Sequence, residues 1–351
     1  MALLTIPAVR LSGLSGCVPQ KVEYTRDYQW ITKKEREQLI KSVGVEKRHV
    51  APKDTTTADL CVIAAEKLLT ELAWDRKEIE LLVFVSQSRD YWVPTTACII
   101  QDRLGLAHSC IAFDISMGCS GFVYGLSVAG AMMQSGAIRK ALLLVGDIST
   151  LTTSYRDKST YPLFGDAGTA TALEFDEDAV PMIFNMQTDG SGFGAIIIRD
   201  GGARNRINRK SFDVKKYAPG IHRTHIQLEL DGIEVFNFSL REVVPNIKAL
   251  LGHSGKTLAD FDYVVFHQAN LLINETVRKM LRLEKEKVPY SIRDFGNTSC
   301  ASVPLTMITA LRNDLASRRV RLLLSAFGVG LSWGSVSLET DTIVCPELII
   351  K

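Results

Sequence analysis

A single cysteine lies in a turn of small residues at 114–124, DISMGCSGFVY. The apolar segment 111–116 predicts a strand before it, and the periodicity of 121–134 predicts a helix after it. Cys119 would then stand at a helix N-terminus, where the helix dipole and free N–H groups lower a thiol pKa and favour the nucleophilic thiolate. The same local pattern also fits a buried core cysteine at a tight helix start.

Two further polar residues fall where predicted elements end. His267 ends an apolar strand at 263–267, and Asn297 lies in the turn 294–304, DFGNTSCASVP, before a helix with an early proline. Taken alone, each residue has a structural explanation, as a hydrogen-bonded His or as an Asn in a turn or N-cap. Chemistry at these residues requires a fold that brings them to Cys119.

An internal repeat supplies such a fold. ELLVFVSQ at 80–87 and FDYVVFHQ at 261–268 match at an offset of 181 residues, and the same offset places Cys119 on Cys300. In each copy a turn of small residues precedes an amphipathic helix, basic residues and a short apolar strand. Pseudo-twofold packing would bring both helix starts and His267 to one site.

The repeat also predicts the architecture. Strands and helices alternate in both copies, which favours an α/β fold with helices packed on sheets. We expect two halves, 1–178 with the candidate nucleophile and 179–351 with the candidate His and Asn. The segment 1–16 predicts one β-strand rather than a signal peptide.

Composition argues against several classes of function. The net charge of +2 gives no basis for binding nucleic acid or a membrane surface, and no apolar stretch has the length of a membrane span. Seven scattered cysteines without a C-x-x-C pair favour a reducing compartment, so we expect a cytoplasmic protein. The absence of metal-ligand spacing and nucleotide-binding motifs predicts neither metal nor cofactor.

Several blocks together resemble the active-site blocks of β-ketoacyl-acyl-carrier-protein synthase III, in the thiolase superfamily. They are DISMGCSGFVYGL, VVFHQANLLI, DFGNTSCASVP and FGVGLSWG, and VGVEKRH, FGDAGTA and GIEVF resemble further family blocks. The matches run in family order from residue 43 to 334. The resemblance implies a duplicated thiolase-like five-layered αβαβα sandwich that forms homodimers.

The activity that this resemblance implies is a decarboxylating Claisen condensation. Cys119 would take an acyl group from an acyl-coenzyme A or acyl-carrier-protein thioester. His267 and Asn297 would donate hydrogen bonds to the thioester carbonyl of malonyl-acyl-carrier protein and stabilise the enolate left by loss of CO₂. The backbone N–H groups of Cys119 and Val329 would hold the oxyanion that forms when the carbanion attacks the acyl group. No metal or redox cofactor is needed.

Several positions depart from the family pattern, three of them where a carrier protein or coenzyme A docks. Leu272 stands where the family usually has an Arg, Gln38 stands where a Trp stacks on the adenine of coenzyme A, and Lys158 replaces an Arg. These differences favour an acyl group delivered on a carrier protein or another thioester, and a specialised pathway over primary fatty-acid initiation.

The resemblance also indicates the acyl pocket. Trp92 and Val93, in the segment SQSRDYWVP, and Phe327, in the oxyanion turn, are the residues we expect to line it. Val93 replaces a frequent Phe, which predicts a wider or reshaped pocket.

A basic docking face is expected because carrier proteins are acidic. Arg278 and Lys279 lie on one predicted helix and are the first candidates, with Lys158 as a third. The segment 199–216, which contains glycines and is predicted to be a loop, adds seven basic residues.

Two other functions remain open. The same scaffold could pass the acyl group of Cys119 to an alcohol or amine without decarboxylation, or the chain could be a non-catalytic partner subunit of a condensing complex. Asn297 beside His267 favours condensation, and a scaffold subunit would need none of Cys119, His267 and Asn297.

Overall fold

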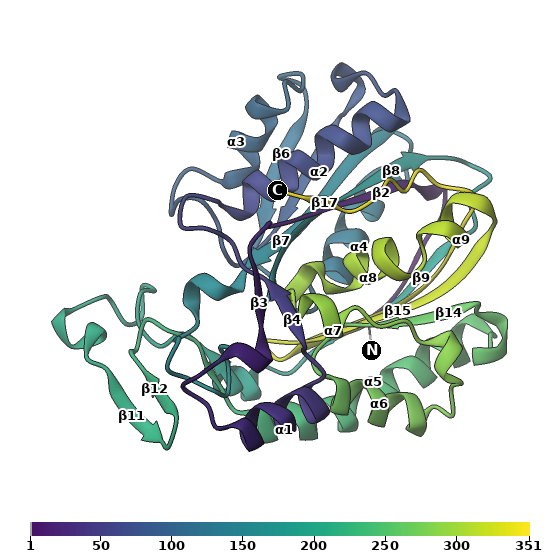
Figure 1. The fold of residues 1–351 in the computed structure, drawn as a ribbon. Helices are drawn as coiled ribbons and strands as arrows, with labels where there is room; N and C mark the ends of the chain where they lie inside the picture. Colours follow the sequence, from purple (N-terminus) through teal and green to yellow (C-terminus); the bar gives the residue numbers. More distant parts are fainter. Residues whose placement is uncertain (1) are drawn as a thin grey trace.

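The computed structural model describes residues 2–351 and is built around two β-sheets (Figure 1). The larger sheet has six strands in the order β17-β2-β8-β7-β5-β6, and the smaller has five in the order β1-β9-β16-β15-β14. The strands of the larger sheet are β2 (Val9–Val18), β5 (Leu81–Val85), β6 (Ile111–Ile115), β7 (Lys140–Ile148), β8 (Asp166–Phe175) and β17 (Ile349–Ile350). Those of the smaller sheet are β1 (Ala2–Ile6), β9 (Met182–Thr188), β14 (Tyr263–Phe266), β15 (Val320–Gly328) and β16 (Ser332–Thr340).

Helices cover both faces of each sheet and complete five layers (Figure 1). α4 and α8 lie between the sheets, α2 and α3 cover the outer face of the larger sheet, and α5 and α6 cover the outer face of the smaller. The helices are α1 (Lys33–Val43), α2 (Thr57–Leu72), α3 (Thr96–Arg103), α4 (Gly121–Met133), α5 (Gly232–Ser254), α6 (Leu271–Met280), α7 (Ile292–Phe295), α8 (Ser302–Ala310) and α9 (Arg312–Ser317).

The alternation of side chains in the central strands explains these layers. In β5, Leu81, Val83 and Val85 pack into the core between the sheets, whereas Leu82 and Phe84 pack beneath the outer helices. A strand covered on both faces is apolar throughout, and this is why the sequence shows continuous runs rather than alternation. The predicted αβαβα sandwich is confirmed.

The two halves share one strand order. β5 pairs parallel with β7, which pairs antiparallel with β8, and β14, β15 and β16 repeat this arrangement in the smaller sheet. β2 and β9 extend the two sheets in the same sense. The helix starts also correspond, because Ser302 at the start of α8 follows Gly121 at the start of α4 by the predicted offset of 181 residues.

The chain ends depart from the expected halves. The prediction of one strand at 1–16 was wrong: β1 and β2 are separate strands, because Pro7 has no N–H and Ala8 has a φ of 59°. β1 pairs with β9 in the smaller sheet, and β17 pairs with β2 in the larger one. The division at 178/179 falls between β8 and β9 and stays a prediction.

The remaining strands lie outside the two sheets. β3 (Val22–Tyr24) pairs with β4 (Lys47–His49), while β10 (Ile196–Ile197) pairs with β13 (Glu229–Leu230). β11 (Lys215–Ala218) and β12 (Ile221–Arg223) form a hairpin that projects from the sandwich (Figure 1). Within residues 2–351, no helix has both the length and the apolar character needed to cross a membrane.

Candidate active site

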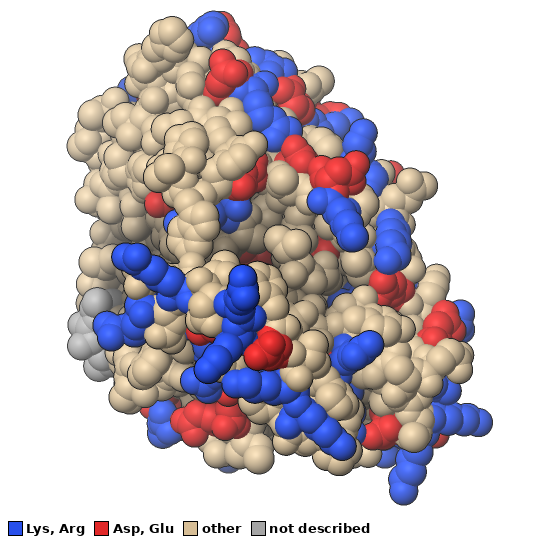
Figure 2. All heavy atoms as spheres, turned by 90° about the vertical axis from the view of Figure 1, so that its left-hand side faces the viewer, with Lys and Arg blue, Asp and Glu red and all other residues tan. Residues whose placement is uncertain are grey.

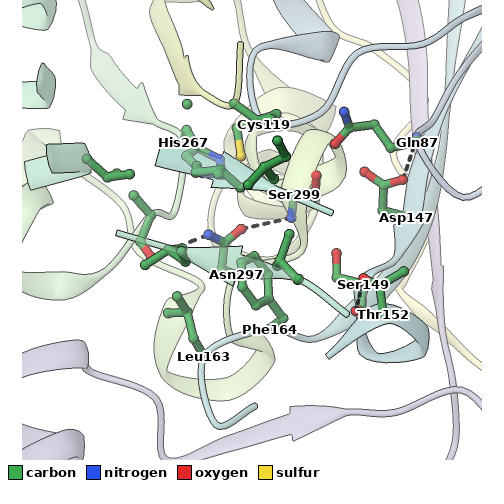
Figure 3. A pocket seen from close by; sticks show the side chains of 18 of the residues that line it. Gln87, Cys119, Asp147, Ser149, Thr152, Leu163, Phe164, His267, Asn297 and Ser299 are labelled. Atoms are coloured by element: carbon green, nitrogen blue, oxygen red, sulfur yellow. Dashed lines mark hydrogen bonds between the residues drawn. The ribbon is translucent and has the colours of Figure 1, made fainter. Parts of the chain in front are cut away.

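Cys119, His267 and Asn297 line one cavity of about 380 Å³ (Figure 3). Cys119 lies in the turn between β6 and α4, His267 follows β14, and Asn297 precedes α8. The first comes from one half and the other two from the second half, as the repeat predicted. The structure therefore brings the three residues together, and their chemical roles remain predictions.

The Cys119 thiol is packed against the turn that follows β15. A Cβ atom added at Gly328 would lie 2.8 Å from the sulfur, and the φ of Gly328 is 155°, so this position requires glycine. The backbone N–H groups of Val329 and of Cys119 itself donate to the sulfur. The two predicted oxyanion donors thus face the nucleophile.

The expectation of a lowered Cys119 pKa was wrong. Burial is the largest influence and raises the pKa of the thiol to about 11, and the charge of Asp147 raises it further. The N–H groups of Val329 and Cys119 lower it, but they do not offset the loss of water around a side chain that is 7% exposed. The resting enzyme therefore holds a neutral thiol.

His267 is fully enclosed and neutral. Burial lowers its pKa to about 3, against a hydrogen bond with the Ser299 backbone that acts in the opposite direction. The Nδ1 atom lies 2.6 Å from the Ser302 hydroxyl, and the ring meets the Phe327 ring edge-on at 5.6 Å. A neutral imidazole in this setting can donate one hydrogen bond and accept another.

Asn297 is held through its backbone and its side-chain oxygen. Its backbone N–H donates to the Leu163 carbonyl at 2.9 Å, and Oδ1 accepts from the Ser299 N–H at 2.9 Å. Nδ2 makes one long hydrogen bond, 3.4 Å, to the Ala269 carbonyl. The amide therefore keeps donor capacity beside His267 (Figure 3).

The predicted pocket residues separate into two groups. Phe327 lines the cavity. Trp92 and Val93 do not line it, because their segment runs over the surface after β5, leaving the two side chains 69% and 83% exposed. Trp92 instead packs beneath the Arg89 guanidinium, at 4.3 Å. The prediction for Trp92 and Val93 was wrong for the single chain.

The three docking candidates also differ. Arg278 is 9% exposed, makes two hydrogen bonds of 2.8 Å to Glu275 and donates to the Leu283 carbonyl, so it is a structural residue and the prediction for it was wrong. Lys279 is exposed. Lys158 pairs with Glu35 at 2.7 Å and lines a second cavity that adjoins the first.

The sequence did not single out Asp147, which lines the cavity at the end of β7. Its Oδ1 accepts from the Ser86 and Ser88 hydroxyls and from the Gln87 and Ser88 N–H groups, at 2.8–3.1 Å. Its Oδ2 accepts from the Cys300 thiol at 3.3 Å. The one available signal was a carboxylate directly after the apolar run ALLLVG.

Known proteins share both the sequence and the fold of this chain. Residues 113–191 match the family described as 3-oxoacyl-(acyl-carrier-protein) synthase III, and residues 251–340 match the family of its C-terminal part. A β-ketoacyl-(acyl-carrier-protein) synthase III from Syntrophomonas wolfei is 32% identical over 94% of this chain and 97% of its own.

Solved structures agree with this match. A 3-oxoacyl-(acyl-carrier-protein) synthase from Burkholderia xenovorans is 35% identical, covering 100% of this chain and 99% of its own, with a TM-score of 0.94. The priming β-ketosynthase of a polyketide biosynthetic pathway is 26% identical over 97% of this chain and 98% of its own, with a TM-score of 0.80.

The two packed sheets and the cavity between the halves define a thiolase-like condensing enzyme. The chain belongs to the β-ketoacyl-(acyl-carrier-protein) synthase III family. It is accordingly an acyltransferase of this condensing type, acting in fatty-acid initiation or polyketide priming. The family implies acyl-carrier protein and acyl thioesters as substrates.

Proposed function

We propose that Cys119 is the acyl acceptor of this condensation and that His267 and Asn297 activate the malonyl thioester. The observation that carries the proposal is the convergence of the three side chains on one cavity, with the Val329 N–H directed at the sulfur. In the first step the sulfur of Cys119 bonds to the acyl carbon, the bond from that carbon to the donor sulfur breaks, and the thiol proton leaves with the donor thiol.

The second step breaks the bond between the malonyl carboxyl and its α-carbon. CO₂ leaves, and the electron pair moves into the thioester as an enolate, whose oxygen accepts hydrogen bonds from the His267 imidazole and the Asn297 amide. Because the pKa of His267 is near 3, its donor N–H is present without any added proton at neutral pH.

The third step joins the two carbon units. The α-carbon attacks the acyl carbonyl on Cys119, and the resulting oxyanion accepts from the N–H groups of Cys119 and Val329. Collapse of this intermediate breaks the carbon–sulfur bond and returns Cys119, which takes up a proton. The product is a β-ketoacyl group on the carrier protein.

We propose that the acyl donor is an acyl-carrier protein and that it reaches Cys119 through the second cavity. The second cavity shares Leu163 and Asn270 with the first and leads towards Lys158, whose charge is already paired with Glu35. Gln38 and Leu272, at positions where the resemblance would have an aromatic ring and an Arg, are exposed and uncharged. These residues offer little for coenzyme A to bind.

A basic face is available for an acidic carrier. Figure 2 shows Lys and Arg side chains gathered below a hollow on the face that carries β11 and β12. The seven basic residues of 199–216 belong to this part of the chain, and all seven are exposed. This surface is one proposed docking region, and exposed Lys279 on α6 is a separate candidate.

A homodimer whose subunits each divide at 178/179 is also part of the proposal. β6 is an unpaired edge of the larger sheet among the described residues, with Ile111 exposed. Trp92 and Val93 are exposed apolar residues on the segment that follows the neighbouring strand β5. A second copy of the chain packed against this face would cover both the unpaired strand edge and the exposed apolar residues.

One experiment separates the proposed reaction from its alternatives. The protein is incubated with a panel of acyl thioesters, and the intact mass is recorded for the wild type and for Cys119→Ala. We expect adducts that are absent from the variant, followed by CO₂ release and a β-ketoacyl product when malonyl-carrier protein is added. Product without CO₂ would indicate simple acyl transfer, and no adduct with any donor would contradict the role of Cys119.

A further inference from the structure

One wall of the active-site cavity is polar. Gln87, Asp147, Ser149 and Thr152 lie on one side of the Cys119 sulfur, across the cavity from His267 and Asn297 (Figure 3). Gln87 follows β5, Asp147 lies at the end of β7, and Ser149 and Thr152 follow β7. The sulfur of Cys119 lies between this wall and the pair that would hold the malonyl thioester.

The polar wall lies on the side of the main cavity away from the second cavity, which is the entrance in the function proposed above. The second cavity, which leads to Lys158, meets the main cavity at Leu163, Leu230, Gly232 and Asn270. A thioester that arrives from that direction presents its carbonyl to Cys119, and its acyl group then extends towards the opposite wall. The polar residues are therefore placed to contact the acyl group rather than its carrier.

Two side chains of this wall have free hydrogen-bonding groups. Among residues 2–351, neither the Gln87 amide nor the Ser149 hydroxyl has a hydrogen-bond partner, whereas the Thr152 hydroxyl donates to the Ser149 carbonyl. Gln87 is exposed and Ser149 is half-buried, so in the empty cavity water can reach both groups. An alkyl chain packed against them would displace part of this water without replacing its hydrogen bonds, which is unfavourable. An acyl group with a hydroxyl would satisfy them.

The carboxylate in the wall favours a neutral hydroxyl over an amine. Four neutral donors already stabilise Oδ1 of Asp147, and Oδ2 has the weak thiol donor of Cys300. Oδ2 can accept one more hydrogen bond from a hydroxyl. An ammonium group would have to leave water for a cavity that Leu228, Leu230 and Val235 also line, at a large desolvation cost.

We infer that Cys119 accepts an acyl group that carries a hydroxyl substituent, which binds to Gln87, Ser149 and Asp147. The inference rests on the proposed role of Cys119 and adds the chemical class of the acyl group. It concerns binding of the substituent only, so the bonds formed and broken on Cys119 are those of the acyl transfer described above.

The test compares matched thioesters of N-acetylcysteamine, which need no docking surface. Rates of Cys119 acylation are measured by intact mass for butyryl and 3-hydroxybutyryl groups, for propanoyl and lactoyl groups, and for a 3-aminobutyryl group. We expect at least one hydroxylated member to react about tenfold faster than its alkyl counterpart, as one or two neutral hydrogen bonds would give. Equal or faster reaction of both alkyl members, or fastest reaction of the amine, would overturn the inference.

Substitutions of wall residues test whether the polar wall causes the preference for a hydroxylated acyl group. Ser149→Ala and Gln87→Met each remove a hydrogen-bonding group, and each is expected to reduce the ratio of hydroxyacyl to alkyl acylation rates several-fold. Ser317→Ala, at the exposed end of α9, is the matched control and should keep the wild-type preference. An unchanged preference in both wall variants would contradict the assignment.

The two proposals fail differently. If no thioester modifies Cys119, the role of the nucleophile fails and the acyl class fails with it. If alkyl groups modify Cys119 at least as fast as hydroxylated ones, the nucleophile stands and only the acyl class is wrong.

Discussion

The Nδ1 atom of His267 lies 2.6 Å from the hydroxyl oxygen of Ser302, the first residue of α8. The same hydroxyl accepts a hydrogen bond from the Gln268 N–H at 3.3 Å. The oxygen of a hydroxyl has two lone pairs, so the contact with Nδ1 can form whichever of the two atoms carries the proton. Ser302 thus fixes the orientation of the His267 ring through Nδ1.

Ser302→Ala should weaken this control of His267. We expect kcat for malonyl decarboxylation to fall about tenfold with a smaller change in KM, because the ring loses the hydrogen bond that fixes its orientation while the carrier contacts remain. Steady-state CO₂ release measures both constants. Ser302→Thr, which keeps the hydroxyl, should recover part of the rate, and an unchanged kcat in Ser302→Ala would show that the contact has no such role.

The raised pKa of Cys119 predicts slow alkylation at neutral pH. A shift from the ordinary value of 9 to about 11 reduces the thiolate fraction about 100-fold, since each pKa unit is a factor of ten. The rate of Cys119 alkylation by iodoacetamide, followed by peptide mass spectrometry, should rise tenfold per pH unit from pH 7 to about 10. A plateau below pH 9 would contradict the neutral thiol.

Gly328→Ala should block acylation. The new methyl would lie 2.8 Å from the sulfur at a φ of 155°, so both the space for the acyl group and the backbone of the turn are disturbed. We expect a loss of acylation of at least 100-fold and a decrease of about 1–3 kcal/mol in the free energy of unfolding. Gly194→Ala, where a Cβ meets open space, is the control and should acylate normally.

Substitutions of the neighbouring residues Lys279 and Arg278 should affect different properties, carrier binding for Lys279 and stability for Arg278. Lys279→Glu should raise KM for malonyl-carrier protein several-fold, more so at low salt, and leave stability unchanged, because the side chain is exposed. Arg278→Ala should decrease the free energy of unfolding by about 2 kcal/mol, because Glu275 and the Leu283 carbonyl lose their partner. Thermal unfolding and salt-dependent kinetics measure the two effects, and the reverse pattern would reject both assignments.

Cys300→Ala should leave acylation within about twofold of wild type. Cys300 is the repeat counterpart of Cys119, but its thiol is enclosed and donates to Asp147 and to the Val85 carbonyl, and burial raises its pKa. Intact mass after incubation with an acyl thioester measures the effect. A large loss of adduct would mean that the two cysteines act together.

Local sequence patterns predicted the layers and the meeting of Cys119, His267 and Asn297, because strand pairing and the repeat depend on apolar periodicity. The pKa of Cys119 could not be predicted in this way. The sequence indicates that Cys119 stands at a helix N-terminus, but it does not show how deeply the thiol is buried. The error at Arg278 has the same cause, because its burial and its hydrogen bond to the Leu283 carbonyl depend on the fold, whereas its i,i+3 pairing with Glu275 follows from the predicted helix.

The polar wall was missed for a related reason. Gln87, Asp147 and Ser149 follow two strands that are 55 or more residues apart along the chain, and each residue taken alone is an ordinary strand-end residue. Trp92 and Val93 were assigned from resemblance to a pocket segment, but the course of that segment over the surface depends on tertiary structure.

β1 pairs in the smaller sheet and β17 in the larger one, and this has a consequence for how the chain folds. β1 is synthesised about 180 residues before its partner β9, and β2 more than 300 residues before its partner β17. Both sheets therefore gain an outer strand only after long-range pairing, which is slow. Fragments cut between β8 and β9 would each lack a strand supplied by the other, so they should fold together rather than separately.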